Sequence, residues 1–253
     1  DIIASNILPE GSLQLIVGLG RGIIDHVQTE DTVTFTGSAK TGKILKGLPQ
    51  IADRSVSFNL EADSLNACIL GEKAVPGTAE FDLFIKEVSK EITVKAGQKC
   101  TAVRRILVPD SLIDEVQSAL VSRLASTKVG DPSVEGVRMG ALATKLQVER
   151  VRENANLLAK SQEIVFGSID EVQVLGANAS QGAFISPILF RNNKPLINTD
   201  VHDIECFGPV STLMPYKSLD EAISLARMGK GSLVSSIVTP DDQEAMDYVL
   251  GAG

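Results

Sequence analysis

One cysteine, Cys100, lies in a setting that suits covalent chemistry. It sits behind a glycine and among small residues, and four cations are close by in the sequence: Lys95, Lys99, Arg104 and Arg105. A thiol reacts as its thiolate, and nearby cations or backbone N–H groups lower its pKa from about 8.5 toward neutrality. We therefore take Cys100 as a candidate nucleophile. The alternative is a small core residue, which is the usual fate of a free cysteine.

The other two cysteines, Cys68 and Cys206, are predicted to be packing residues. Cys68 lies in the apolar run 67–70, so its thiol is expected to be a core residue. Cys206 is more ambiguous, because it stands between Glu205 and the turn Phe207-Gly208-Pro209, but we interpret its thiol as packing too. No export signal is visible, so reduced thiols in a cytoplasmic protein are the simplest interpretation of an odd number of cysteines.

A carboxylate, Glu61, follows a predicted strand at residues 55–60. The carboxyl ends of parallel strands are where α/β folds bind ligands, and a carboxylate there can take a proton from water. A solvated strand end explains Glu61 equally well, and Asp63 fits that description too. The sequence around Glu61 leaves both interpretations open.

A glycine-containing turn, from Gly37 through Ser38 to Gly42, joins a predicted strand to a predicted helix. Glycine permits close approach to the backbone, and the N–H groups at a helix N-terminus favour an anion such as a pyrophosphate. The turn lacks the six-position Rossmann fingerprint, so an ordinary tight turn between a strand and a helix is the alternative.

The two histidines argue against two other kinds of site. His26 and His202 are far apart in the sequence and have no Cys-x-x-Cys partner, so a zinc site is not expected. His26 lies in an acidic amphipathic stretch and His202 lies between Asp200 and Asp203. We interpret both as ordinary solvated positions, which disfavours a Ser-His-Asp mechanism.

Composition narrows the class of protein. The chain has 253 residues and is 43% hydrophobic, which is enough for one or two domains with a sizeable core. The net charge of −8 argues against a nucleic-acid binder, since phosphate recognition needs a clustered basic face. Neither a membrane-spanning apolar run nor a signal peptide is visible in the sequence.

Short β-branched runs alternate with helical patterns, which is typical of an α/β fold with a largely parallel sheet. We predict strands at residues 13–17, 32–36, 55–60, 105–108, 163–166, 184–190, 210–216 and 233–238. We predict helices from about residue 41 and at residues 80–94, 112–125, 144–161, 219–228 and 241–250.

Taken together, four ordered motifs resemble the aldehyde dehydrogenase superfamily. They are Phe35-Thr36-Gly37-Ser38 with Gly42, then Leu60-Glu61, then Gly97-Gln98-Lys99-Cys100, and last Glu205-Cys206-Phe207-Gly208-Pro209. Most members follow the glutamate with Leu-Gly-Gly, whereas this chain has Ala62-Asp63-Ser64. That variant, with the stretches 103–106 and 129–132, is similar to the phenylacetic acid degradation branch. In that branch an aldehyde dehydrogenase domain is fused to a ring-opening, hydratase-like domain, and it oxidises the semialdehyde of the opened oxepin-CoA ring.

The resemblance implies a role for each candidate residue. Cys100 would attack the aldehyde, hydride would pass to NADP or NAD, and Glu61 would activate the water that hydrolyses the resulting thioester. The backbone N–H of Cys100 would help to stabilise the oxyanion. The cofactor would be held by Gly37, Ser38, Gly42, Glu205 and Phe207, with Glu205 on the nicotinamide ribose. The branch favours NADP over NAD.

The resemblance also predicts how the chain is organised. The fold expected is α/β and aldehyde-dehydrogenase-like, with the C-terminal half of the dinucleotide-binding domain at residues 1–63 and most of the α/β catalytic domain at residues 64–253. We expect an internal fragment of a longer cytoplasmic protein, inactive or nearly so by itself. The full-length protein is expected to be a homo-oligomer with a small, CoA-linked aldehyde as substrate, and without a metal, nucleic-acid or membrane partner.

Two other functions remain open at this point. One is a CoA-acylating dehydrogenase, in which CoA rather than water takes the acyl group from Cys100. Glu61 argues against it, because transfer to a thiol needs no water-activating carboxylate. The other is a non-catalytic scaffold that keeps the fold, against which the presence of Cys100, Glu61 and Glu205 counts.

Overall fold

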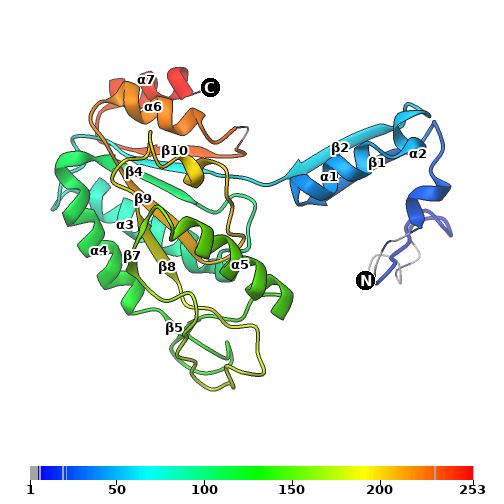
Figure 1. Ribbon diagram of the computed structural model, residues 1–253, viewed down its shortest axis with the longest axis horizontal. Coiled ribbons are helices and arrows are strands. Elements are labelled where there is room, and N and C mark those ends of the chain that lie inside the picture. Colours follow the sequence, from blue (N-terminus) through cyan, green and yellow to red (C-terminus); the bar gives the residue numbers. More distant parts are fainter. Residues whose placement is uncertain (1–4, 6, 19, 21, 231, 253) are drawn as a thin grey trace. The chain divides into compact units, whose positions relative to one another are not determined.

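The computed structural model describes residue 5, residues 7–18, residue 20, residues 22–230 and residues 232–252. The chain divides into two compact units, Asp1–Asp63 and Ser64–Gly253 (Figure 1). Each unit has its own sheet, and each is described separately below. In the described ranges no helix is both long and apolar enough to cross a membrane.

The first unit is built on a pair of parallel strands. Strands β1 (Thr32–Gly37) and β2 (Ser57–Ala62) pair from Thr32 opposite Ser57 to Gly37 opposite Ala62. Helices α1 (Ala39–Lys46) and α2 (Pro49–Ala52) form the connection between them. A 3₁₀ turn, η2 (Ile23–His26), precedes β1. Helix α1 begins where it does because the Ser38 side chain caps it, accepting a hydrogen bond from the N–H of Thr41.

One predicted strand of the first unit is absent. Residues 13–17 form no strand, and the side chains of Leu15, Ile16 and Val17 are 76%, 66% and 89% exposed. A strand needs a neighbour to pair its backbone groups and bury its side chains. Within the described residues of this unit, β1 and β2 pair only with each other. The apolar run alone therefore gave the wrong prediction.

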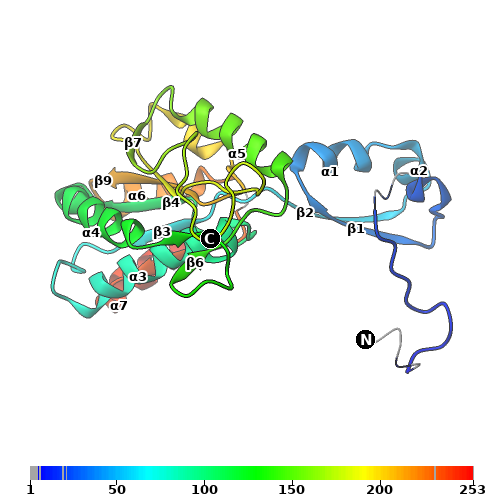
Figure 2. The ribbon, with the colours of Figure 1, turned by 90° about the horizontal axis from the view of Figure 1, so that it is seen from below.

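The second unit is a six-stranded sheet covered by helices. The strand order is β10-β3-β4-β9-β8-β7, and every neighbouring pair is parallel except the antiparallel pair of β7 and β8 at one edge. Figures 1 and 2 show the helices packed around this sheet. The largely parallel sheet expected from the alternating strand and helix patterns is confirmed.

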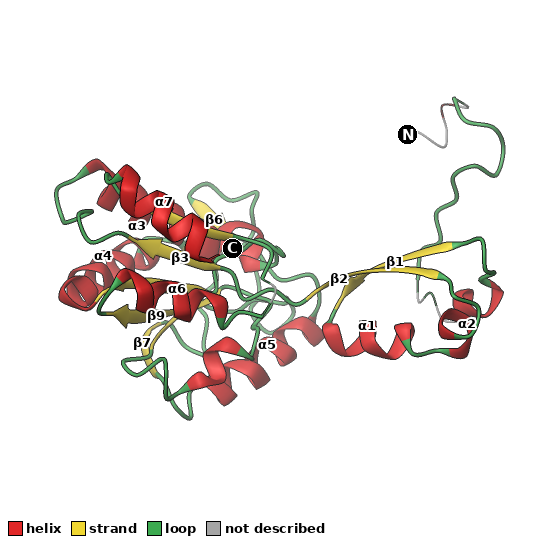
Figure 3. Ribbon diagram, turned by 90° about the horizontal axis from the view of Figure 1, so that it is seen from above, coloured by secondary structure: helices red, strands yellow, loops and turns green. Residues whose placement is uncertain are grey.

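The strands, helices and 3₁₀ turns of the second unit follow one another in the order expected for an α/β fold (Figure 3). Its strands are β3 (Ala67–Leu70), β4 (Arg105–Pro109), β5 (Lys128–Val129), β6 (Val137–Met139), β7 (Glu163–Phe166), β8 (Ile188–Arg191), β9 (Val210–Tyr216) and β10 (Ser235–Val238). Its helices are α3 (Ala79–Thr93), α4 (Ile113–Ala125), α5 (Lys145–Leu158), α6 (Leu219–Arg227) and α7 (Asp242–Ala252). Its 3₁₀ turns are η3 (Val94–Gly97), η4 (Asp110–Leu112) and η5 (Thr199–His202).

Successive side chains of the central strands pack in different hydrophobic clusters. On β4, Ile106 and Val108 pack with α3 and α4, whereas Leu107 packs with α6 and α7. Successive residues of a strand point to opposite faces, so helices cover the sheet on both sides. A third cluster lies between α5, β8 and the start of β9. Burial on both faces explains why every residue of β3 and β4 is buried, instead of every second one.

The parallel order of β3, β4 and β9 brings three loop segments to one edge of the sheet. Residues 64–66 lead into β3, residues 97–104 lead into β4, and residues 205–209 lead into β9. Because the strands are parallel and adjacent, their amino ends lie together. The segments that hold Cys100 and Glu205 therefore meet at that edge.

Candidate active site

Cys100 lies in a turn between η3 and β4, and its side chain is exposed. The turn begins with three residues that have positive φ: Lys95 at 53°, Ala96 at 51° and Gly97 at 68°. A left-handed backbone is disfavoured for residues with a side chain, so packing must hold the first two there. The chain then closes through a hydrogen bond from the N–H of Ala102 to the carbonyl of Lys99, 3.2 Å.

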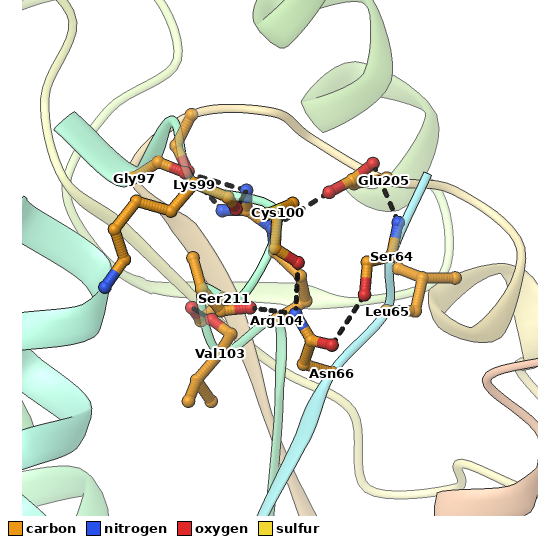
Figure 4. Close-up of polar contacts among 12 residues, drawn as sticks. Ser64, Leu65, Asn66, Gly97, Lys99, Cys100, Val103, Arg104, Glu205 and Ser211 are labelled. Carbon is orange, nitrogen blue, oxygen red and sulfur yellow. Dashed lines mark hydrogen bonds and ion pairs between the residues drawn. The ribbon is translucent and has the colours of Figure 1, made fainter. Parts of the chain in front are cut away.

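Asn66, just before β3, holds the Cys100 turn through hydrogen bonds to its backbone. Its Nδ2 donates to the carbonyl oxygens of Cys100 (2.8 Å) and Ala102 (2.9 Å). Its Oδ1 accepts from the Ser64 hydroxyl (2.5 Å) and from the N–H of Val234 (2.9 Å). The side chain is 1% exposed, and both its donors and its acceptor are used (Figure 4). The peptide at Cys100 is therefore fixed to two neighbouring strand entries.

Arg104 binds the Cys100 turn to the Glu205 turn. Its guanidinium donates to the carbonyl of Gly97 (2.7 Å) and to the carbonyl of Gly208 (2.7 Å). The Arg104 side chain is 4% exposed, and its Nε lies 3.4 Å from Glu205 Oε1. Burial lowers the pKa of the Arg104 guanidinium, and the Glu205 carboxylate counteracts that shift.

The carboxylate of Glu205 accepts from donors on two different segments. Besides Arg104 at Oε1, the N–H of Ser64 donates to Oε2 at 3.2 Å (Figure 4). The backbone is fixed as well, since Asn154 of α5 donates to the Glu205 carbonyl at 2.7 Å. The ring of the next aromatic residue, Phe207, lies 5.7 Å from the Arg104 guanidinium carbon and is 36% exposed.

Three of the four cations near Cys100 in the sequence have other partners in space. Lys99 pairs with Glu91 at 2.6 Å, and Arg104 pairs with Glu205. Arg105 is fully buried and points to the far side of β4, where it donates to the carbonyls of Leu65, Leu225 and Ala226. Proximity in sequence therefore did not describe the environment of the thiol.

The packing role predicted for Cys68 and Cys206 is confirmed. Their side chains are 6% and 3% exposed. Burial raises the pKa of the Cys68 thiol to about 11 and that of the Cys206 thiol to about 12. Both are therefore protonated and enclosed at neutral pH, whereas the side chain of Cys100 is exposed.

The prediction that His202 is solvated is wrong. Its ring is 1% exposed, with Nδ1 3.0 Å from Arg105 Nη1 and Nε2 3.0 Å from the carbonyl of Pro195. Burial, together with the Arg105 cation, lowers the pKa of His202 to about 4. The neutral ring thus accepts from Arg105 and donates to Pro195, which is a structural role. The flanking Asp200 and Asp203 suggested a solvated position, but η5 turns the ring inward.

The remaining predicted residues belong to the first unit. Gly37 and Ser38 form the turn between β1 and α1, Gly42 lies in α1, and Glu61 lies next to the last residue of β2. A Cβ at Gly42 would approach Leu60 Cδ1 to 2.2 Å, and one at Gly37 would approach the Phe35 ring to 2.5 Å. A Cβ at either position would have to displace a neighbouring side chain, so local packing by itself favours glycine there.

The start of α1 has the donors that a diphosphate needs. The Ser38 hydroxyl caps the helix at the N–H of Thr41, and helix N-terminal N–H groups attract anions. Lys40 and Lys43 are exposed on the same short helix. These residues fit the diphosphate of a dinucleotide, and the Glu205 carboxylate of the second unit is of the type that accepts from ribose hydroxyls.

The described residues contain no cluster of three or more His, Cys, Asp or Glu side chains that could hold a metal ion. A cavity of about 870 Å³ lies in the second unit, between the end of α4, helix α5 and the loop 166–187. None of the candidate residues lines it. The cations Lys145 and Arg152 in its wall already donate to the carbonyls of Ser180 and Ile169.

The sequence did not single out Asn66 or the role of Arg104. Asn66 is a polar residue at the entry of an apolar strand, and such a residue indicates a buried hydrogen-bonding position. For Arg104 no comparable sign exists, since its acceptors are backbone carbonyls up to 104 positions away. Only the three-dimensional arrangement identifies it.

The sequence model of the aldehyde dehydrogenase family matches residues 1–250. A 3,4-dehydroadipyl-CoA semialdehyde dehydrogenase from Aromatoleum evansii is 44% identical over 241 residues, which is 95% of this chain and 47% of that protein. An alpha-ketoglutaric semialdehyde dehydrogenase from Bacillus subtilis is 27% identical over 254 residues, 96% of this chain and 48% of that protein. The chain thus spans about half the length of the curated relatives it matches.

Solved structures support the same fold. A betaine aldehyde dehydrogenase double mutant from Staphylococcus aureus, in complex with NAD⁺, superposes with a TM-score of 0.82 at 24% identity, over 99% of this chain and 48% of that one. An aldehyde dehydrogenase mutant from Bacillus cereus superposes with a TM-score of 0.74 at 27% identity, over 87% of this chain and 42% of that one. The chain belongs to the aldehyde dehydrogenase family, and the expected aldehyde-dehydrogenase-like fold is confirmed.

Proposed function

We propose that this member of the aldehyde dehydrogenase family is the nucleophile-bearing part of an NAD(P)-dependent semialdehyde dehydrogenase. The observation that supports the proposal most is the contrast among the three cysteines. Cys100 is exposed in a turn that Asn66 and Arg104 hold, whereas Cys68 and Cys206 are enclosed. A reactive thiol must be accessible and fixed in place, and Cys100 meets both conditions.

In the proposed reaction the Cys100 thiolate attacks the aldehyde carbon, and the carbonyl oxygen becomes an oxyanion. The backbone N–H of Cys100 donates to that oxyanion. Asn66 holds the carbonyl oxygens of Cys100 and Ala102, which prevents the turn from rotating away during the attack. When bound, the nicotinamide cofactor supplies the acceptor for the hydride that leaves the thiohemiacetal carbon.

The acyl group then remains on Cys100 as a thioester. Glu61 takes a proton from a water molecule, whose oxygen attacks the thioester carbon. The carbon–sulfur bond breaks, the carboxylic acid leaves, and the Cys100 thiolate is regenerated. In the proposed cofactor site, Gly37, Ser38 and Gly42 serve the diphosphate through the start of α1, while Glu205 and Phe207 serve the nicotinamide ribose.

The proposed substrate is a CoA-linked semialdehyde produced when an aromatic acid is degraded by ring opening, of the phenylacetate type. The relative from Aromatoleum evansii, named for a CoA-linked semialdehyde, supports this class. By resemblance to the same branch we propose NADP as the preferred cofactor, with NAD as the alternative. The active form is proposed to be the full-length homo-oligomer, and the 253-residue chain alone is expected to have little or no activity.

The test uses the full-length protein with a CoA-linked aliphatic semialdehyde and either dinucleotide, following cofactor reduction. Cys100→Ala is expected to abolish turnover. Glu61→Gln is expected to form the acyl-enzyme and release it slowly, so that intact-protein mass spectrometry finds one acyl group on Cys100. The matched control is Cys68→Ala, which removes a thiol from the core and should leave turnover measurable.

Two outcomes separate the alternatives. A CoA-acylating dehydrogenase would release an acyl-CoA only when CoA is added, and Glu61→Gln would not accumulate the thioester. A non-catalytic scaffold would reduce neither dinucleotide, and Cys100 would react with iodoacetamide no faster than a model thiol between about pH 6 and pH 9. Either result would contradict the proposal.

A further inference from the structure

We propose that Arg104 is a positioning residue that joins the Cys100 turn to the Glu205 turn and orients the Glu205 carboxylate for the cofactor ribose. This inference rests on the proposed function of Glu205 and adds a residue to that site. Arg104 itself contacts neither substrate nor reacting atoms in the proposal. It acts through Glu205 and through the backbone of the two turns.

The guanidinium reaches acceptors on both turns at once. On the Cys100 turn it donates to the carbonyl of Gly97 at 2.7 Å and lies 3.4 Å from the carbonyl of Lys99. On the other turn it donates to the carbonyl of Gly208 at 2.7 Å and lies 3.4 Å from Glu205 Oε1. These segments are about a hundred positions apart in sequence, and one side chain bridges them (Figure 4).

The two turns also touch directly, which makes the bridge sensitive to small changes. A Cβ added to Gly97 would lie 2.1 Å from the carbonyl oxygen of Gly208. The backbones of the two turns are in contact at this point, so the turns cannot move closer together. The hydrogen bonds of Arg104 prevent the turns from moving apart. Contact on one side and hydrogen bonds on the other fix Cys100 relative to Glu205.

The shape of the guanidinium suits this task and an ammonium group does not. Arginine has five N–H donors in a rigid plane, whereas lysine is a single point charge on a flexible stem. In addition, the Phe207 ring packs 5.7 Å from the guanidinium carbon. The edge of the plane thus makes hydrogen bonds while Phe207 contacts the group, an arrangement that Lys at position 104 would lose.

Arg104 is the cationic donor at Oε1 of Glu205. The N–H of Ser64, which comes from the entry of β3, donates to Oε2 at 3.2 Å. Arg104 and the N–H of Ser64 come from two strand entries and act on different oxygens of the carboxylate, so loss of Arg104 removes the charge-assisted contact at Oε1. Loss of Arg104 should therefore weaken the interaction of Glu205 with ribose hydroxyls while Cys100 stays in place on Asn66.

The test is performed on the full-length protein with Arg104→Lys and Arg104→Met. Dinucleotide binding is measured by isothermal titration calorimetry, alongside KM and kcat. We expect the Kd and the KM for the dinucleotide to rise about tenfold, the effect of one lost charge-assisted hydrogen bond, while kcat falls less. The control is Arg191→Lys, at an arginine that pairs with Asp114 and Gln117 on the outside of β8.

A double-mutant cycle with Glu205→Gln shows whether Arg104 acts through Glu205. In that background Arg104→Met should no longer raise the Kd. If the two substitutions raise the Kd independently, or if Arg104→Met lowers only the unfolding temperature with Kd and KM unchanged, the positioning role is wrong. Arg104→Lys, which keeps the charge, serves the same comparison should Arg104→Met not fold.

The outcome also separates this inference from the proposed function. Wild-type protein that binds neither NADP nor NAD contradicts both. Wild-type protein that binds a dinucleotide as tightly as the Arg104 variants do contradicts the positioning role alone and leaves the dehydrogenase proposal standing.

Discussion

Replacing Asn66 with alanine should destabilise the second unit more than any other change of a single small side chain near Cys100. The substitution removes one buried amide that is bonded on every side. It leaves the carbonyls of Cys100 and Ala102, the hydroxyl of Ser64 and the N–H of Val234 without that partner. At 1% exposure the site gives water little access to replace the amide.

The magnitude follows from these four hydrogen bonds. A buried hydrogen bond contributes about 1 kcal/mol net to the free energy of unfolding, so we expect a loss of about 4 kcal/mol. Asn66→Asp keeps the shape and the two accepted bonds, but it turns an oxygen toward the carbonyl oxygens of Cys100 and Ala102. The aspartate variant should therefore be destabilised as well, despite its near-identical volume.

The assay is urea unfolding followed by circular dichroism, with the free energy taken by linear extrapolation. The control is Asn156→Ala on the exposed side of α5, which should change stability by less than about 0.5 kcal/mol. A loss below about 1 kcal/mol for Asn66→Ala, with the same urea dependence as wild type, would refute the reasoning. It would mean that the neighbouring groups find new partners.

Three further predictions concern pH, thiol access and backbone packing. First, the folded-state pKa of His202, about 4, lies below its ordinary 6.5, so the unfolded chain takes up the proton first as pH falls. The contribution of the neutral His202 ring to the free energy of unfolding is complete above the ordinary pKa. It is lost on acidification, by up to about 3 kcal/mol. His202→Gln should flatten the pH dependence of the urea midpoint, and an unchanged slope would contradict the assignment. Second, iodoacetamide should modify Cys100 in the native protein well before Cys68 or Cys206, whose pKa values burial raises to about 11 and about 12. Peptide mapping checks the order, and early labelling of Cys206 would be the opposite result. Third, Gly97→Ala, with φ 68° and a Cβ 2.1 Å from the Gly208 oxygen, should cost more than about 2 kcal/mol. Gly77→Ala, with φ 93° and open space around it, should cost about 1 kcal/mol, and equal losses in thermal unfolding would show that the contact is relieved.

The sequence predicted the fold well where a strand or helix is specified by a pattern of nearby residues. The strands predicted at residues 105–108 and 210–216 appear as β4 and β9, and the helices predicted at residues 80–94 and 144–161 appear as α3 and α5. These features depend on residues a few positions apart. Residues 13–17 show the limit of this approach, since an apolar run becomes a strand only when another strand is there to pair with it.

The candidate site also has a part that the sequence predicted and a part that it did not. Cys100 and Glu205 were recognisable from their motifs, and the accessibility of Cys100 agrees with a nucleophile's needs. The environment of the thiol was not predictable, because Lys99, Arg104 and Arg105 each have partners elsewhere. His202 was misjudged because its ring turns inward onto Arg105 and Pro195, which are not its neighbours in sequence.

The sequence by itself determined the family, the α/β class and the residue types available for chemistry at Cys100, Glu61 and Glu205. Periodicity, caps and motifs are short-range properties of the chain, so they can be read without a structure. Only the tertiary structure decided that Asn66 and Arg104 hold the Cys100 turn, because parallel pairing of β3, β4 and β9 brings their amino ends to one edge. Hydrogen bonds between residues tens to a hundred positions apart leave no trace in local sequence, and in this protein they are what fix the turn that carries Cys100.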